Sequence, residues 1–213
     1  YRRKAVAKQN VPERDSGKLQ TETEVAVLIQ TVEQLKAVWN SPYVKEIILE
    51  SDMVPLTELN EYTKEIVRRN KQVLLALPHV MKRKSYDYFL KNNSFLEDNT
   101  INGYLIRTLE EYYLLKKDIG TIKRIFGDSD LYAMNRQAAE YLTELGIGGI
   151  TAPFELNDQE LQDISDIYRY ITVYGRIPLM ISAQCLYLTG NGKNRKDSNF
   201  DASDEACCYK DVK

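Results

Sequence analysis

Residues 46–77 read EIILESDMVPLTELNEYTKEIVRRNKQVLLAL, and this stretch decides the expected fold. Short apolar runs at Glu46–Leu49 and Val73–Leu77 flank the stretch Leu56–Arg69, whose apolar residues recur at helical spacing. Parallel strands joined by a crossover helix give this pattern, because both faces of such a strand are buried. The stretch therefore predicts one unit of strand, helix and strand.

The same pattern recurs on both sides of this stretch. Strands are expected at Val25–Ile29, Glu46–Leu49, Val73–Leu77, Gly103–Ile106, Ile122–Phe126, Gly149–Ala152 and Tyr170–Val173, with an eighth candidate at Leu179–Ser182. Helices are expected at Thr31–Trp39, Leu56–Arg69, Leu109–Lys117, Tyr132–Leu145 and Asp158–Ile164. The repeat predicts an α/β fold, a TIM-barrel-like arrangement of seven to eight parallel strands, complete or incomplete. A doubly wound open sheet would show a similar pattern.

Three segments of different character are expected along the chain. Residues 1–23 are charged and aperiodic, as in a short helix and linker; residues 24–189 form the barrel-like domain; residues 190–213 are a polar, cysteine-containing tail or loop. Within the domain, the aromatic stretch Lys82–Thr100 is expected to be a helical excursion that overhangs the working face. The chain is interpreted as a piece of a longer protein.

Composition excludes several classes of protein. Hydrophobic residues make up 43% and charged residues 28% of the chain, the balance of an ordinary globular domain. The net charge is -2, so the chain as a whole does not favour non-specific capture of nucleic acid, although a local basic patch stays open. Apolar runs such as Val73–Leu77 fall far short of the roughly 20 residues of a membrane span. Three cysteines do not make a disulfide framework, and a reduced, cytoplasmic setting is expected.

Polar residues just past the strands are the candidates for chemistry, because the carboxyl ends of parallel barrel strands share one rim. The candidates on this rim are Gln30, Glu50, Asp52, His79, Arg107, Asp128, Asp130, Glu155, Arg176, Gln184 and Cys185. Asp128 and Asp130 also suit an ordinary turn and helix cap. Phosphate-loop and dinucleotide-binding motifs do not occur in the sequence.

Each candidate has a functional and a structural interpretation. Glu155 suits an acid, a base or a cation ligand, or else a carboxylate that complements a helix dipole. His79, the single histidine, suits proton transfer or else a solvated loop. Arg107 and Arg176 suit a phosphate or carboxylate ligand, or else an ion pair with a neighbouring rim acid.

The cysteines leave three alternatives open. Cys185 follows the last expected strand, and Cys207 and Cys208 follow in the tail. Together they suit a metal or iron-sulfur site, which would need a fourth thiolate from outside this chain. Alternatively, Cys185 is a nucleophile with His79 as its base, or a small buried thiol.

Residues 174–185, YGRIPLMISAQC, closely resemble the end of the peptidase U32 family, the collagenase-like peptidases. Three further segments resemble the family in order: Val73–Pro78, residues 130–146 from Asp130 through Asn135, and residues 149–156 with Glu155. The resemblance implies a TIM-barrel-like fold and a peptidase, and by position Cys185 matches the first cysteine of a terminal cluster. Some members resemble iron-sulfur proteins that support hydroxylation of RNA bases or quinone precursors.

Three hypotheses follow from these residues and from the resemblance. The first is a peptidase acting on a peptide, with Glu155, Arg176 and His79 as catalytic residues. Substrate-binding residues are then Gln30, Arg107, Asn135 and Gln184. The second is an iron-sulfur-dependent hydroxylase-type domain acting on RNA or an aromatic small molecule, with Cys185, Cys207 and Cys208 as ligands of a cluster completed outside the chain. The third is a non-catalytic barrel that binds other domains of the parent protein.

Overall fold

The computed structural model describes residues 24–178 and residue 181. Seven strands form one parallel sheet in the order β1-β2-β3-β4-β5-β6-β7. Their bounds are Val25–Ile29 (β1), Val44–Glu50 (β2), Gln72–Ala76 (β3), Gly103–Ile106 (β4), Arg124–Gly127 (β5), Ile147–Thr151 (β6) and Tyr168–Tyr170 (β7). Each strand therefore pairs with its neighbours in sequence, as in a β/α barrel and unlike a doubly wound sheet, whose order reverses.

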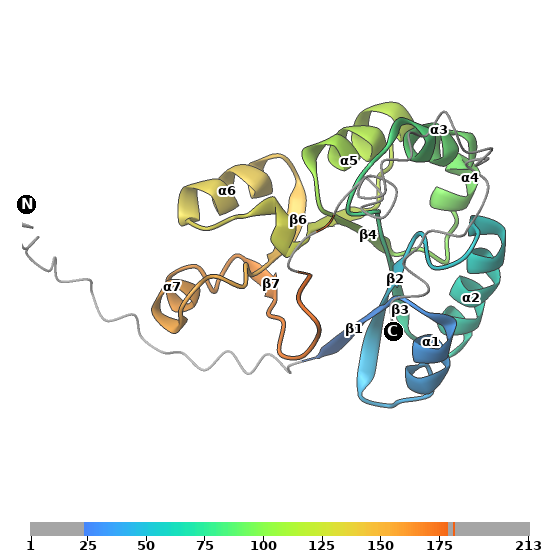
Figure 1. The fold of residues 1–213 in the computed structure, drawn as a ribbon, viewed down its shortest axis with the longest axis horizontal. Helices are drawn as coiled ribbons and strands as arrows, with labels where there is room; N and C mark the ends of the chain where they lie inside the picture. Colours follow the sequence, from blue (N-terminus) through green and yellow to red (C-terminus); the bar gives the residue numbers. More distant parts are fainter. Residues whose placement is uncertain (1–23, 179–180, 182–213) are drawn as a thin grey trace, which may run out of the picture.

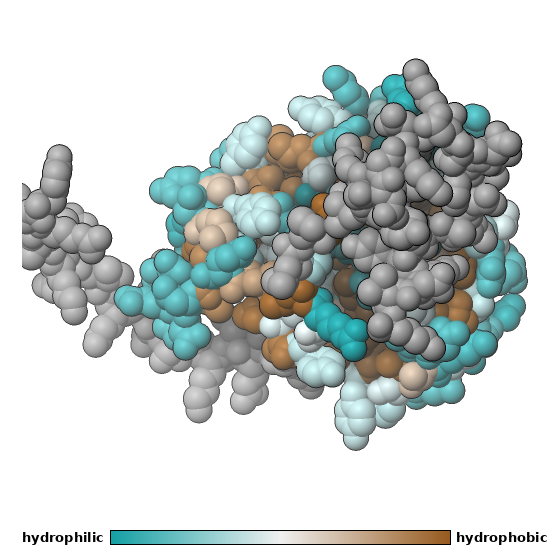
Figure 2. All heavy atoms as spheres, in the orientation of Figure 1, coloured by the Kyte–Doolittle hydropathy of each residue, from teal (hydrophilic) through white to brown (hydrophobic). Residues whose placement is uncertain are grey.

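The sheet curls into a half-barrel with helices along its outer side (Figure 1). The helices are Val32–Val38 (α1), Leu56–Arg68 (α2), Arg83–Lys91 (α3), Asn93–Leu96 (α4), Leu109–Tyr113 (α5), Arg136–Glu144 (α6) and Asp158–Asp163 (α7). In the orientation of Figure 1, Figure 2 shows hydrophobic residues over much of the middle of the visible face, with hydrophilic residues mostly, but not only, near its edge. The expected TIM-barrel-like α/β fold, in an incomplete form, is confirmed for the described residues.

Side-chain alternation along the strands builds two apolar layers. On β2, Ile47 and Leu49 join the large cluster between sheet and helices, whereas Ile48 joins a second cluster with side chains of the next strands. This second cluster lies on the inner side of the curve and contains Ile48, Leu74, Ala76, Leu105 and Phe126. Because successive side chains point to opposite faces, Glu46 and Glu50 lie on the inner side as well. Glu46 and Glu50 thus lie at opposite ends of the inner side, and the second apolar cluster lies between them.

A polar contact joins the last two residues of β7 to Glu46, near the amino end of β2, across the interior. Arg169 Nη2 donates to Glu46 Oε2 at 3.2 Å, and the Tyr170 hydroxyl donates to Glu46 Oε1. Burial and the hydrogen bond to Glu46 raise the pKa of Tyr170 above its ordinary value. The Arg169 guanidinium also lies 4.5 Å from the ring centroid of Phe126. These contacts close the curve between strands that do not pair in the described sheet.

Capping residues in the sequence predict some helix ends correctly and others wrongly. The sequence carries a capping residue at Asn157 and a helix stop at Gly146, and both act so: Asn157 caps α7 through a capping box, and Gly146 follows α6 with φ of 92°. Thr57 does not cap α2, which begins at Leu56 after Pro55. The helix expected from Tyr132 begins only at Arg136, because Tyr132 has φ of 50° and the Asn135 side chain caps α6. The helix expected to Lys117 is α5 followed by a π-helical segment, Leu114–Ile119.

Apolar residues at two expected strands lie outside the observed strands. Ile122 is 94% exposed, and β5 begins at Arg124. Val173 is 92% exposed, and β7 ends at Tyr170. The sequence pattern marks apolar residues, but a strand end is set by where the neighbouring strand offers hydrogen bonds. The eighth strand candidate, Leu179–Ser182, lies outside the described residues except for Ile181, as do residues 1–23 and 182–213.

The excursion Lys82–Thr100 folds as α3 and α4 beside the carboxyl ends of β2 and β3. Phe89 and Leu96 join the large apolar cluster, and the Tyr88 hydroxyl accepts a hydrogen bond from the Leu56 backbone N–H at 3.4 Å. The α3 helix of this segment therefore lies beside the carboxyl ends of β2 and β3 and borders the rim there. Among the described helices, none has the length and apolarity that crossing a membrane requires.

Close packing of β4 against β5 gives a test of the observed register. A Cβ atom added at Gly103 would lie 2.6 Å from the Arg124 backbone oxygen, a contact that only a shift of the strand relieves. We expect Gly103→Ala to lower the free energy of unfolding by about 2 kcal/mol or more, measured by urea denaturation.

Gly175→Ala is the matched control, because no atom of the described residues lies within 4 Å of its added Cβ, and it should change stability by less than about 0.5 kcal/mol. Equal stabilities of the two variants would contradict the described pairing of β4 and β5.

Candidate functional site at the carboxyl ends of the strands

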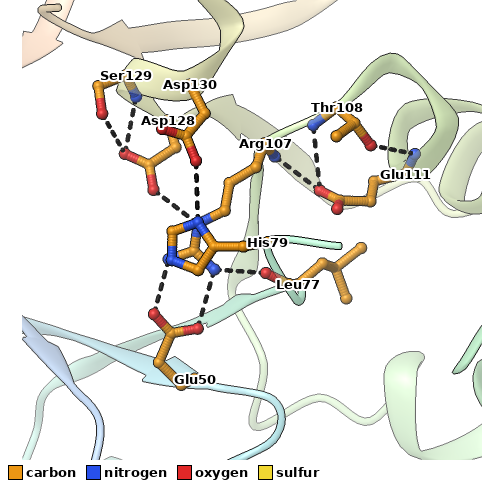
Figure 3. A network of polar contacts seen from close by, with 9 residues as sticks. All are labelled: Glu50, Leu77, His79, Arg107, Thr108, Glu111, Asp128, Ser129 and Asp130. Atoms are coloured by element: carbon orange, nitrogen blue, oxygen red, sulfur yellow. Dashed lines mark hydrogen bonds and ion pairs between the residues drawn. The ribbon is translucent and has the colours of Figure 1, made fainter. Parts of the chain in front are cut away.

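A buried arginine occupies the centre of the rim (Figure 3). The Arg107 guanidinium binds Glu50 with both ends of its fork, Nη1 to Oε2 at 2.9 Å and Nη2 to Oε1 at 2.7 Å. Its Nε donates to Asp128 Oδ2 at 2.9 Å, and Nη1 also donates to the Leu77 carbonyl at 2.5 Å. The side chains of Arg107 and Glu50 are only 1% and 6% exposed. One cation therefore joins the ends of β2, β3, β4 and β5.

The charges of this network depend on one another. Burial alone would lower the pKa of Arg107, but the hydrogen bonds and charge of Glu50, with the charge of Asp128, raise the pKa above its ordinary value. The bidentate geometry matches the planar guanidinium to a carboxylate. Arg107 was expected either to bind substrate or to form an ion pair with a rim acid, and the geometry is that of the ion pair. A substrate-binding role for Arg107 stays a prediction.

A second buried carboxylate, Glu111, lies behind Arg107 on the first turn of α5. Its Oε2 accepts hydrogen bonds from the backbone N–H groups of Arg107 at 2.6 Å and Thr108 at 3.4 Å. Its Oε1 is buried and has no hydrogen-bond partner among the described residues. Burial raises the pKa of Glu111 to about 7, although the hydrogen bonds from Arg107 and Thr108 oppose this. The capping pattern Thr-x-x-Glu at residues 108–111 was visible in the sequence, but its burial was not.

A histidine and a carboxylate meet beside this network. His79 Nδ1 lies 2.9 Å from Asp130 Oδ2, and their side chains are 27% and 34% exposed. An ionised carboxylate only accepts hydrogen bonds, so Nδ1 carries the proton that joins the pair. In the neutral ring Nε2 then has a lone pair, and no described residue donates a hydrogen bond to it. The arrangement suits proton transfer at a solvent-accessible site.

A shallow groove of about 340 Å³ adjoins the same rim. Its lining comes from the β2–α2 loop, the residue before His79 and the first two turns of α3, and consists of Ser51, Asp52, Pro78, Lys84, Ser85, Tyr88 and Phe89. The Ser51 hydroxyl is buried and has no hydrogen-bond partner among the described residues. Asp52 was among the residues expected at the rim, whereas Ser51, Tyr88 and Phe89 were not, because the position of α3 is set by tertiary packing.

Other expected site residues do not reach the network. Gln30 is exposed after β1, and its backbone N–H donates to Gln34 Oε1 at 2.8 Å. Asn135 accepts a hydrogen bond from the Ala138 backbone N–H at 2.9 Å as a helix cap. Glu155 and Arg176 are exposed, beyond β6 and β7. Gln184, Cys185, Cys207 and Cys208 lie outside the described residues.

Residues 24–178 contain no group of three or more histidine, cysteine, aspartate or glutamate side chains placed to hold a metal ion. The cysteines proposed as cluster ligands are not among these residues. Their arrangement is therefore open.

Comparisons with known proteins give no match in sequence and a weak one in structure. No family model matches the sequence, and no curated protein matches it. Among solved structures, the chain is similar to orotidine 5'-phosphate decarboxylase from Thermotoga maritima, with 13% sequence identity and a TM-score of 0.43. The match covers 70% of this chain and 88% of the decarboxylase.

Replacing Arg107 with an uncharged residue should destabilise the fold. In Arg107→Met the Glu50 and Asp128 carboxylates lose their counter-charge, and we expect the free energy of unfolding to fall by about 3–5 kcal/mol. Arg83→Met is the control, because the pair of Arg83 with Asp87 is exposed and should contribute less than about 1 kcal/mol. Similar small losses in both variants, measured by urea denaturation, would contradict the structural role of Arg107.

Glu111 predicts a particular dependence of stability on pH. Its pKa rises from an ordinary 4.5 to about 7 on folding, so between these values the folded state binds more protons than the unfolded state. Stability therefore falls as pH rises through this window and levels off above it. Glu111→Gln removes this contribution, and its stability relative to wild type should increase by roughly 3 kcal/mol from pH 4.5 to pH 8.

Glu110→Gln, at the exposed neighbouring position, serves as the control and should follow wild type across the range. Urea denaturation at several pH values measures all three proteins. A constant difference between Glu111→Gln and wild type would show that Glu111 does not titrate in this window.

Proposed function

We propose that this chain is the barrel-like domain of a peptidase-type hydrolase, with His79 and Asp130 as its proton-transfer pair. The observation that carries the proposal is the 2.9 Å contact of His79 Nδ1 with Asp130 at the partly exposed rim. The resemblance of residues 174–185 to the peptidase U32 family supports the same class of reaction. The other expected catalytic residues, Glu155 and Arg176, come after β6 and β7 in the chain and are exposed.

The proposed chemistry follows from the protonation of the two partners. His79 Nε2 takes a proton from the attacking group as that group adds to the carbonyl carbon of the scissile peptide. Asp130 holds the ring through Nδ1 and stabilises the imidazolium that forms. The proton then passes from Nε2 to the leaving amine as the C–N bond breaks. The attacking group is a water molecule or, as the sequence also allows, the Cys185 thiol. In the second case the acyl group stays on the Cys185 sulfur as a thioester, and a water that gives its proton to Nε2 then hydrolyses the thioester and frees the thiol.

An exposed apolar edge favours a second candidate, the non-catalytic barrel. On β1, Val25 and Leu28 are 47% and 40% exposed, and beyond β7 Ile171 is 59% exposed. Exposed apolar residues at the two edges of an incomplete barrel suit packing against another domain of a parent protein. This role predicts no turnover of peptides at the rim.

Hydrolysis can be tested on the purified chain with a diverse mixture of synthetic peptides of three to ten residues and mass spectrometry of the products. Wild type should cleave peptide bonds, and His79→Gln should lower the rate at least about 100-fold, because general base catalysis contributes this much. Glu144→Gln, an exposed change on α6, should keep the wild-type rate. Cys185→Ala separates a thiol nucleophile, whose loss abolishes cleavage, from an attacking water.

Two results would overturn the proposal. One is cleavage that His79→Gln leaves unchanged, and the other is no cleavage by wild type across the mixture. Iron and acid-labile sulfide in an anaerobic preparation without peptide cleavage would instead favour the hydroxylase-type alternative.

A further inference from the structure

We propose that the groove beside His79 binds a short peptide with both termini free, its ammonium at Asp52, its carboxylate at Lys84 and an apolar side chain against Tyr88 and Phe89. This inference rests on the proposed function in one respect, because it names the substrate class of the same rim. Binding to the groove can nevertheless be measured without hydrolysis.

The aromatic wall of the groove is held in place by its own contacts. Phe89 is 3% exposed and belongs to the large apolar cluster, whereas Tyr88 is 43% exposed. Their rings meet edge to face with centroids 6.0 Å apart, and the Tyr88 hydroxyl accepts the Leu56 N–H. A preformed aromatic surface favours an aromatic or branched apolar group, because binding then orders few side chains.

The charges of the groove favour a ligand that carries both signs. Asp52 comes from the β2–α2 loop and Lys84 from the first turn of α3. Both are exposed, and neither forms an ion pair within 4.0 Å with a described residue, including with the other. The termini of a short peptide are separated by more than a hydrogen-bond length, so one such molecule can satisfy both charges. A ligand with only a positive charge would pair with Asp52 but lie near the positive charge of Lys84, and a ligand with only a negative charge would lie near Asp52.

Ser51 contributes a hydroxyl group to the lining of the groove, and this hydroxyl has no hydrogen-bond partner among the described residues. Its backbone N–H donates to the Ala76 carbonyl at 2.9 Å, which fixes the residue at the end of the sheet. Its hydroxyl is buried without a partner among residues 24–178, an arrangement that costs free energy in the unliganded protein. A carbonyl or amide of a peptide in the groove, which Ser51 helps to line, would supply the missing partner.

The groove is placed to present a peptide to the proposed base. Pro78 lines the groove, and His79 is the next residue along the chain. A peptide whose apolar side chain lies on Tyr88 and Phe89 would therefore have a neighbouring backbone segment near the His79–Asp130 pair. The groove would then select short peptides by their termini and by one apolar side chain.

The test measures binding of the tripeptide Ala-Phe-Ala to the His79→Gln protein by calorimetry, beside its amidated and acetylated forms. Amidation should lower the affinity about two- to fivefold, the size of an exposed ion pair, and should have no effect in Lys84→Ala. Acetylation should lower it similarly and have no effect in Asp52→Ala. Amidation and acetylation effects that persist unchanged in the matching variants would overturn the assignment of the charges.

Ser51→Ala supplies an independent readout. Loss of an unpaired buried hydroxyl should leave the melting temperature of the free protein unchanged or raise it, while affinity for Ala-Phe-Ala falls about three- to tenfold. A variant that keeps its affinity would exclude Ser51 from the site, and undetectable binding of all three peptides would overturn the proposal. Binding with these signatures but no hydrolysis by wild type would overturn the proposed function alone. His79-dependent hydrolysis with groove variants of unchanged affinity would overturn this inference alone.

Discussion

The bidentate ion pair of Arg107 with Glu50 is the interaction on which the arrangement of the rim depends. Glu50 ends β2, Leu77 follows β3, Arg107 follows β4 and Asp128 follows β5, and all four meet at one guanidinium. Because these charges are buried, removal of one partner leaves the others without compensation. The ion pair therefore specifies the relative positions of four strand ends, whatever its net contribution to stability.

Each strand end that Arg107 holds carries a candidate functional residue one or two positions further along. Glu50 precedes Ser51 and Asp52 of the groove, and Leu77 precedes Pro78 and His79. Asp128 likewise precedes Asp130, the partner of His79. The two halves of the His79–Asp130 pair come from different loops, so the distance between them follows from how the network places β3 and β5. A rigid support of this kind is what a proton-transfer pair requires, because small displacements weaken catalysis.

Much of the fold was readable in the sequence, since apolar runs alternating with amphipathic stretches specify parallel strands and crossover helices. Six of the seven expected strands overlap an observed strand by several residues, β7 shares only Tyr170 with its expected range, and the rim residues after β2 to β5 do meet. The ends of elements were less predictable. Tyr132 adopts a left-handed backbone conformation that no local signal announces, so α6 begins later than its apolar pattern suggested. The link from Tyr170 to Glu46 joins residues 124 positions apart and arises only when the sheet curls.

The state of His79 is the most direct test of the account, because it is the single histidine of the chain and its ring nitrogens give unambiguous signals. Long-range proton–nitrogen correlation NMR on the uniformly labelled protein, at a pH where the ring is neutral, identifies which nitrogen carries the proton. The account predicts a proton on Nδ1, bound to Asp130, and an unprotonated Nε2 able to act as a base. A proton on Nε2 with bare Nδ1 would contradict the contact with Asp130 and remove the proposed proton-transfer pair.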